Sequence, residues 1–142
     1  MYSMNKEVEK VIWEAPKPGS QNGPWRLDVN DFVSSKNLLA TKSMLVHFGP
    51  GSIAGDHRHQ QQEVVIGLSG DLYLAWRDAQ GERHEEELRR EDGKLQAFVI
   101  ASGVPHLIEN RSSAAFGLMQ VWHGLVDEPV LLEGEESLRP QE

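Results

Sequence analysis

Hydrophobic residues along this chain fall into short runs that alternate with polar positions, and turn residues separate one run from the next. Alternation with a period of two is typical of half-buried β-strands. We therefore expect strands at residues 8–15, 43–48, 63–70, 71–78, 82–90, 95–101, 106–113 and 114–124. No stretch keeps a helical period over three turns. Short strands with turns at regular spacing predict an all-β sandwich or small barrel with little helix.

The segments between and after these runs are less regular. Residues 16–25 are rich in Pro, Gly and Asn, which predicts a loop. Residues 25–40 are ambiguous between a strand and a short helical turn, and residues 127–142 are expected to add one strand before the chain frays. The chain is long enough for one hydrophobic core, so we expect a single domain over 1–142 with a core at about 8–133 and loose ends.

The composition narrows the choice of partners. The net charge of −8 argues against nucleic acid or an anionic membrane as the main partner, and it leaves a small anionic ligand possible. The chain has no cysteine, which excludes disulfides, thiolate zinc sites and a cysteine nucleophile. It shows neither a signal peptide nor an apolar run near the roughly 20 residues needed to cross a bilayer, so we expect a cytoplasmic protein.

The residues that suggest chemistry are concentrated in one short stretch. His57 and His59 lie two residues apart, so in a strand they point to one face, and Glu63 shares that face if the intervening residues keep the register. Imidazole and carboxylate are ligands for divalent Fe, Mn, Ni, Co, Cu or Zn. A fourth ligand should come from a neighbouring strand, and His106 is the candidate. A pair of histidines alone more often belongs to a polar turn, so the pair by itself does not establish a metal site.

The spacing around the histidines is more specific than the pair itself. From Gly51 to Gly70 the sequence fits G-x5-H-x-H-x3-E-x6-G without a gap, and this resembles the first signature of the cupin superfamily. The segment ASGVPHLIEN resembles the second cupin signature, in which it keeps Gly103, His106 and Asn110 at the family's spacing.

The second signature is incomplete in this chain. Ala101 stands where the family usually has proline, and Leu95 stands where it has glycine. Gly93 lies two residues too early to replace that glycine. We interpret the difference as a longer turn before the strand, which leaves His106 in its place.

The resemblance implies a cupin-type double-stranded β-helix, in which two antiparallel sheets close into a small jelly-roll barrel. It also implies one divalent transition metal inside the barrel, with His57, His59, Glu63 and His106 as ligands. Four protein ligands leave one or two positions open on a five- or six-coordinate ion, and an open position is typical of a catalytic site. The expected partner at that position is a small-molecule substrate.

The neighbours of these ligands should shape a substrate pocket. Phe98 and Ile100 lie shortly before His106 and are expected to form part of its wall. Gln120 and Trp122 share one face of the strand at 114–124. If that face points inward, Gln120 is the polar group of an apolar wall and orients a substrate or a metal-bound water.

Gly67 lies four residues after Glu63 and therefore on the same strand face. Its missing side chain either leaves space near the metal or marks a bulge, and the sequence leaves both interpretations open. Among the other histidines, His84 is expected to be exposed and His47 to face away from the barrel. His123 lies at a strand end and is expected to have no role in the site, with a place at the barrel mouth as the alternative.

Three functions remain open from the sequence. The resemblance favours a metal-dependent enzyme, a dioxygenase or an isomerase, that acts on a small oxygenated organic substrate, and fold alone does not decide the reaction. A sugar-nucleotide ketoisomerase is an alternative, although such cupins typically carry arginine where this chain has Ala54, Gly55 and Asp56. A non-catalytic module that senses a ligand or metal is the third.

We also expect a homodimer. A single barrel of this kind leaves open sheet edges, and proteins seldom leave such edges bare. The N-terminal segment with Val11, Ile12 and Trp13 is a candidate for a strand that pairs with a second subunit.

Overall fold

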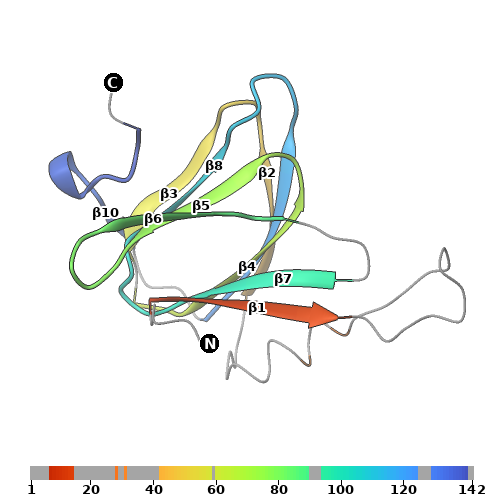
Figure 1. The fold of residues 1–142 in the computed structure, drawn as a ribbon, viewed down its shortest axis with the longest axis horizontal. Coiled ribbons are helices and arrows are strands. Elements are labelled where there is room, and N and C mark those ends of the chain that lie inside the picture. The colour runs from red at the N-terminus through yellow and green to blue at the C-terminus, as the bar shows by residue number, and fades with distance from the viewer. Residues whose placement is uncertain are drawn as a thin grey trace, which may run out of the picture.

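The computed structural model describes residues 7–14, 28, 31, 42–58, 60–89, 94–124 and 129–140. In this part of the chain, ten strands form two five-stranded antiparallel sheets (Figure 1). Sheet A has the order β1-β7-β4-β9-β2, and sheet B has the order β10-β3-β8-β5-β6. The strands are β1 (Val8–Glu14), β2 (Lys42–Phe48), β3 (Ile53–Arg58), β4 (Glu63–Ser69), β5 (Leu72–Arg77), β6 (Arg83–Glu87), β7 (Lys94–Ile100), β8 (His106–Asn110), β9 (Gly117–His123) and β10 (Val130–Leu131). The all-β jelly-roll prediction is confirmed.

The main hydrophobic core lies between the two sheets. One apolar cluster combines Val65, Phe98 and Val121 of sheet A with Leu74 and Ile108 of sheet B, and none of these side chains is more than 3% exposed. Burial of apolar surface is the largest favourable contribution to folding. Because alternate residues of a strand point to opposite faces, this cluster also shows which positions of each strand face the barrel interior.

Sheet A carries a second apolar layer on its outer face. Val64 and Ile66 of β4 pack with Ala97 and Val99 of β7, and each is at most 5% exposed. A strand that is buried on both faces needs apolar residues at consecutive positions, and this explains the unbroken apolar runs in β4 and β7.

The C-terminal segment packs on the outer face of sheet B. Leu131 of β10 lies opposite His57 of β3, and Leu132 and Leu138 pack against that face together with Leu107. Leu138 is 0% exposed. The segment therefore stays packed beyond residue 133, where we expected the core to end, because its leucines cover apolar side chains that would otherwise meet water.

A buried asparagine ends β8 earlier than expected. The side-chain amide of Asn110 donates hydrogen bonds to the carbonyl oxygens of Gly49 (3.0 Å) and Ala115 (2.8 Å), and its oxygen accepts one from the Ser112 amide (3.2 Å). These bonds fix the turn after the strand, so β8 ends at 110 rather than at 113.

The loop predicted at 16–25 and the ambiguous segment at 25–40 lie outside the described residues, apart from Asp28 and Asp31. Within the described ranges, a 3-10 turn at Gly134–Glu136 follows β10. In the same part of the chain, no helix has the length and apolar character required to cross a membrane.

Candidate metal centre

In sheet B, the strand register places two histidines side by side. His57 of β3 lies opposite His106 of β8, which in turn lies opposite Trp76 of β5. Directly opposed residues of neighbouring strands point to the same face, here the barrel interior. The register shifts between Gly55 and His57, and Asp56 between them has a left-handed φ of 61°. Such a bulge changes the direction of the next side chain, and here that side chain is His57.

In sheet A, a carboxylate faces these histidines. Glu63 of β4 lies between Ile100 of β7 and His123 of β9 in the ladder. Glu63 is 8% exposed, and the Ile100 side chain belongs to the interior apolar cluster. Glu63 and His123, which lie opposite each other on β4 and β9, therefore both point to the interior at this end of the barrel.

The two sheets bring His57, Glu63 and His106 together at one point. Each offers one ligand atom, and these three atoms lie within 4.8 Å of one another. Nε2 of His106 lies 3.0 Å from Oε2 of Glu63, and the imidazole rings of His57 and His106 are 4.8 Å apart at 89°. The nitrogen and oxygen donors suit a divalent transition metal, and a shared ion would satisfy the buried imidazole and carboxylate together.

The orientation of His106 fits a metal ligand. Its Nδ1 lies 2.9 Å from the carbonyl oxygen of Val104, and the side chain is 2% exposed. An N–H on Nδ1 that donates to this carbonyl leaves the lone pair on Nε2, which points towards Glu63. Metal-binding histidines are commonly fixed by a second hydrogen bond of this kind.

The fourth predicted ligand, His59, lies outside the described residues. The structure thus brings three of the four predicted ligands together, and the place of His59 beside them stays a prediction. The sequence signatures and the fold agree for these three residues. His57 and Glu63 come from the first signature, and His106 comes from β8, which pairs with β3.

Two of the predicted wall residues face the interior. Phe98 and Ile100 are 0% and 1% exposed and belong to the cluster between the sheets. Ile100 is the direct neighbour of Glu63 in the ladder, and Phe98 lies opposite Val65, one step deeper in the barrel. Ile100 is therefore the apolar residue next to the centre.

The inward orientation predicted for Gln120 and Trp122 is wrong. Met119 and Val121 of β9 face the interior, at 3% and 2% exposure, so Gln120 and Trp122 point to the outer side of sheet A. There Gln120 donates a hydrogen bond from Nε2 to Oγ of Ser43 (2.6 Å), and Trp122 packs on the outer apolar cluster. Because β9 has apolar residues on both faces, alternation alone did not identify the inner one.

Gly67 does not provide space beside the centre. A Cβ atom at this position would lie 2.7 Å from both Cβ and the carbonyl oxygen of Leu88. The ladder between β4 and β9 is irregular between Gly67 and Ser69, and Gly67 lies roughly 13 Å along the strand from Glu63. Of the two interpretations, the bulge is supported, since glycine here allows the close approach of Leu88.

The remaining histidines have different surroundings. His47 is exposed on the outer side of β2, as expected, and stacks at 4.9 Å on Phe116. The His84 side chain is 38% exposed, and its Nε2 lies 2.7 Å from Oδ2 of Asp78. That hydrogen bond holds the pKa of Asp78 below its ordinary value. His123 faces the interior beside Glu63, which places it at the barrel mouth.

Asp56 is a residue of this site that the sequence analysis did not identify. It is 5% exposed, accepts hydrogen bonds from the Leu138 amide (2.7 Å) and Ser137 Oγ (2.6 Å), and lies 3.4 Å from Nε of Arg139. The residue before His57 is thereby anchored to the C-terminal segment. An aspartate beside glycine in a strand is the only local signal, since aspartate tolerates the left-handed region better than most residues.

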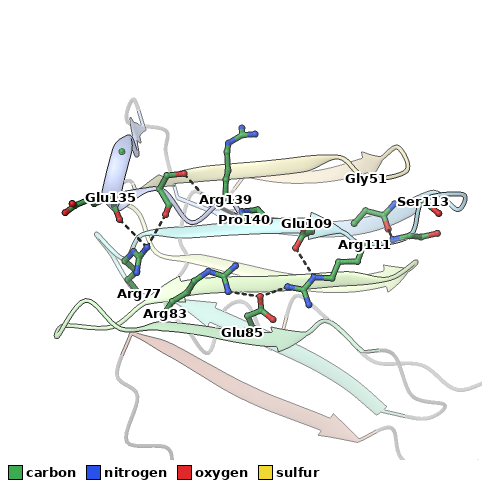
Figure 2. Close-up of a pocket in the computed structure, with 14 residues that line it drawn as sticks. Gly51, Arg77, Arg83, Glu85, Glu109, Arg111, Ser113, Glu135, Arg139 and Pro140 are labelled. Carbon is green, nitrogen blue, oxygen red and sulfur yellow. Dashed lines mark hydrogen bonds and ion pairs between the residues drawn. The ribbon is translucent and has the colours of Figure 1, made fainter. Parts of the chain in front are cut away.

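A cavity of about 1110 Å³ lies away from this centre, between the outer face of sheet B and the C-terminal segment (Figure 2). Its guanidinium groups are already engaged with carboxylates or carbonyl oxygens of the same chain. Arg83 and Arg111 both bond to Glu85, Arg111 also bonds to Glu109 (2.8 Å), and Arg77 donates to the carbonyl oxygens of Gly81 and Ser137 (3.1 Å each). The Arg111 bond holds the pKa of Glu85 below its ordinary value. We call Arg77, Arg83, Glu85, Glu109 and Arg111 the arginine cluster.

Comparison with known proteins connects this geometry to a family. A family model described as the cupin domain matches residues 44–122. No curated protein matches the sequence.

Several solved structures share the fold. The capsular polysaccharide assembling protein CapF from Staphylococcus aureus superposes with a TM-score of 0.55 and 22% identity, over 66% of this chain and 27% of that one. A recombinant oxalate oxidase in complex with glycolate gives 0.56 and 19%, over 86% and 54%. The oxalate decarboxylase formate complex of Lactobacillus farciminis gives 0.53 and 18%, over 65% and 27%. This chain spans from about a quarter to about half of the length of these proteins, and identities this low show the fold alone.

Proposed function

Since this chain belongs to the cupin family, we propose that it is a mononuclear metal-dependent enzyme acting on a small oxygenated organic substrate. The convergence of His57, Glu63 and His106 from two facing sheets carries this proposal. An imidazole–carboxylate pair alone would suit an internal ion pair. The third ligand atom within the same 4.8 Å favours a metal site over such a pair.

Each residue of the centre has a defined task in this proposal. Glu63 supplies the negative charge, and His57 and His106 supply neutral nitrogen donors, with His59 proposed as the fourth ligand. The Val104 carbonyl fixes the tautomer of His106, and Ile100 excludes water from one side of the centre. When bound, a divalent metal supplies a Lewis acid that polarises an oxygen of the substrate. The metal would be Fe, Mn, Ni, Co, Cu or Zn.

The reaction we propose is an oxygenation or an isomerisation. Three or four protein ligands leave coordination positions for the substrate, and His123 lies beside them at the barrel mouth. The oxalate oxidase of the same fold binds glycolate, so small hydroxy and oxo acids are the first compounds to test.

The first test is metal content. The full chain is purified, loaded with each divalent ion in turn, and analysed by elemental mass spectrometry. We expect about one ion per chain in the wild type and in His47→Ala, which removes an exposed histidine on the outer side of β2. His106→Ala should lose most of the ion. Equal metal content in His106→Ala and the wild type would contradict the proposed site.

The second test is turnover, measured as consumption of dioxygen and of the added acid. Loss of substrate in the loaded wild type but not in His106→Ala supports the enzyme. Tight metal binding without turnover of any acid would favour the ligand- or metal-sensing module instead.

We further propose a homodimer formed through β2. This strand is one of the two edges of sheet A among the described strands, the other being β1, and its Met44 and Leu45 are 46% and 60% exposed. Exposed apolar residues on an edge strand favour pairing with another chain. Light scattering should give twice the chain mass, and Leu45→Lys should shift it towards the mass of one chain. A wild-type monomer at high concentration would contradict the dimer.

A further inference from the structure

The indole nitrogen of Trp76 is a buried hydrogen-bond donor without an acceptor in the described chain. Trp76 is 5% exposed, and its indole Nε1–H has no hydrogen-bond partner. Among the described residues, only Gln96 Oε1 shares this property. Native proteins seldom bury an N–H group without an acceptor, and an indole nitrogen acts as a donor only. An acceptor from outside the chain is therefore expected at this position.

The register places Trp76 in the same row as two of the candidate metal ligands. Trp76 of β5 lies directly opposite His106 of β8, and the next residue in the same row is His57 of β3. All three face the barrel interior, where Trp76 belongs to the apolar cluster. Trp76 thus starts from the same end of the barrel as the metal ligands, and we consider this site as the place of the missing acceptor.

The indole is held in place from its other side. The ring of His84 stacks on Trp76 with 5.4 Å between centroids and 16° between planes. His84 bonds to Asp78, which also accepts hydrogen bonds from the amides of Gln80 (2.9 Å) and Glu82 (3.0 Å). A donor fixed by a tight hairpin is preorganised for one position of its acceptor.

We propose that Trp76 Nε1–H donates a hydrogen bond to an anionic oxygen of the substrate, so that the substrate is a small organic oxyanion such as a carboxylate or an enolate. This inference rests on the proposed function. One carboxylate and neutral imidazoles around a divalent ion leave a net positive charge, which favours an anionic ligand. A hydrogen bond to a charged oxygen in a site shielded from water is also stronger than one to a neutral oxygen.

The experiment uses the full chain loaded with Co²⁺, whose visible absorption reports both metal binding and a ligand bound to the metal. Glycolate is titrated as the anionic probe and glycolamide as its neutral counterpart. Trp76→Phe removes the N–H and keeps an aromatic ring over His84. Trp122→Phe is the matched control, because Trp122 packs on the outer side of sheet A.

We expect Trp76→Phe to weaken glycolate binding about 10-fold or more, because a charge-assisted hydrogen bond is lost. Its affinity for Co²⁺ should not change, and Trp122→Phe should match the wild type in both respects. Glycolate should bind more tightly than glycolamide. Equal glycolate affinity in Trp76→Phe and the wild type, or equal binding of the two probes, would overturn the inference. A wild type that binds no Co²⁺ would instead contradict the proposed function.

A second measurement keeps the inference testable if Trp76→Phe does not fold. The zinc-loaded wild type is studied by NMR with assigned indole resonances. Glycolate should move the Trp76 indole N–H resonance downfield more than that of any of the other three tryptophans. An unchanged Trp76 resonance at saturating glycolate would overturn the proposed hydrogen bond.

Discussion

Two regions of sheet B hold clusters of charged or ionisable side chains, and they differ in what those groups do. In the arginine cluster on the outer face, each guanidinium contacts carboxylates or carbonyl oxygens of the same chain, as in Arg83–Glu85–Arg111. On the inner face, His57 and His106 converge with Glu63 on a single point, in the same row as Trp76, whose indole N–H has no acceptor. We infer from this comparison that ligand atoms converging on one point are a better reason to propose a functional site than a large number of charged side chains. The arginine cluster contains more charged groups than the metal centre, but its guanidinium groups already have partners in the same chain.

A glutamate-to-glutamine substitution in each of the two regions should have the largest difference in effect on metal affinity. Glu63→Gln removes the only anionic ligand of the centre, so its affinity for Co²⁺ should fall by at least about 100-fold. Glu85→Gln, an equal change in the arginine cluster, should leave that affinity unchanged. Co²⁺ titration followed by visible absorption measures both. A parallel loss of affinity in the two variants would remove the distinction between the regions.

Asp56 connects the centre with the C-terminal segment and should have the next largest effect. Asp56→Ala removes the acceptor of the Leu138 amide and the Ser137 hydroxyl and places alanine at a left-handed φ. Because His57 follows directly, we expect Co²⁺ affinity to fall about 10-fold and the cobalt absorption spectrum to change. Asp56→Asn should recover much of both, since asparagine tolerates this φ and keeps an acceptor oxygen.

The control for Asp56 is Asp78→Ala, which breaks another aspartate-centred turn. It should lower the melting temperature but leave the cobalt spectrum unchanged. If Asp56→Ala and Asp78→Ala behaved alike in the metal titration, Asp56 would have only a structural role.

The arginine cluster should affect stability rather than metal binding. The bond from Arg111 lowers the pKa of Glu85 below its ordinary value of 4.5, so the ionised carboxylate stabilises the fold above that pH. This contribution is lost as the pH falls through the lowered pKa of the folded state. Glu85→Gln should thus reduce the free energy of unfolding by about 1 kcal/mol or less at pH 7, given the partial exposure of the pair. The difference from the wild type should shrink below pH 4.5 in urea titrations.

Glu86→Gln is the matched control for this measurement, because Glu86 has only a loose contact of 3.7 Å with Lys10. It should change stability less than Glu85→Gln at pH 7. A pH-independent effect of Glu85→Gln would show that the ion pairs do not cause it.

The smallest effect is expected at Gln120, which faces away from the barrel. Gln120→Ala removes one exposed hydrogen bond to Ser43 and should change the free energy of unfolding by less than about 0.5 kcal/mol. Cobalt affinity and glycolate affinity should both stay at their wild-type values. Weaker glycolate binding in Gln120→Ala would show that this side chain reaches the substrate after all.

The sequence by itself was sufficient for most of the strands and for the ligand spacing, although β3 (Ile53–Arg58) was not among the expected strands. Apolar runs bounded by turn residues are local properties of the chain, and the strands β4, β5 and β7 lie where those runs lie. The stretch from Gly51 to Gly70 fixes the separation of His57 and Glu63, and the second signature keeps His106. These features need only the period of a strand and a fixed count of residues.

The tertiary structure decided which side of each strand meets the metal centre. β9 is apolar on both faces because sheet A packs on both of its sides, so only the packing shows that Val121 rather than Trp122 points inward. The unpartnered indole of Trp76 and the anchoring of Asp56 by Leu138 likewise depend on contacts between residues far apart in the sequence. A local pattern sets the alternation of a strand, but the choice of its inner face depends on which neighbours bury it, and that is a property of the assembled barrel.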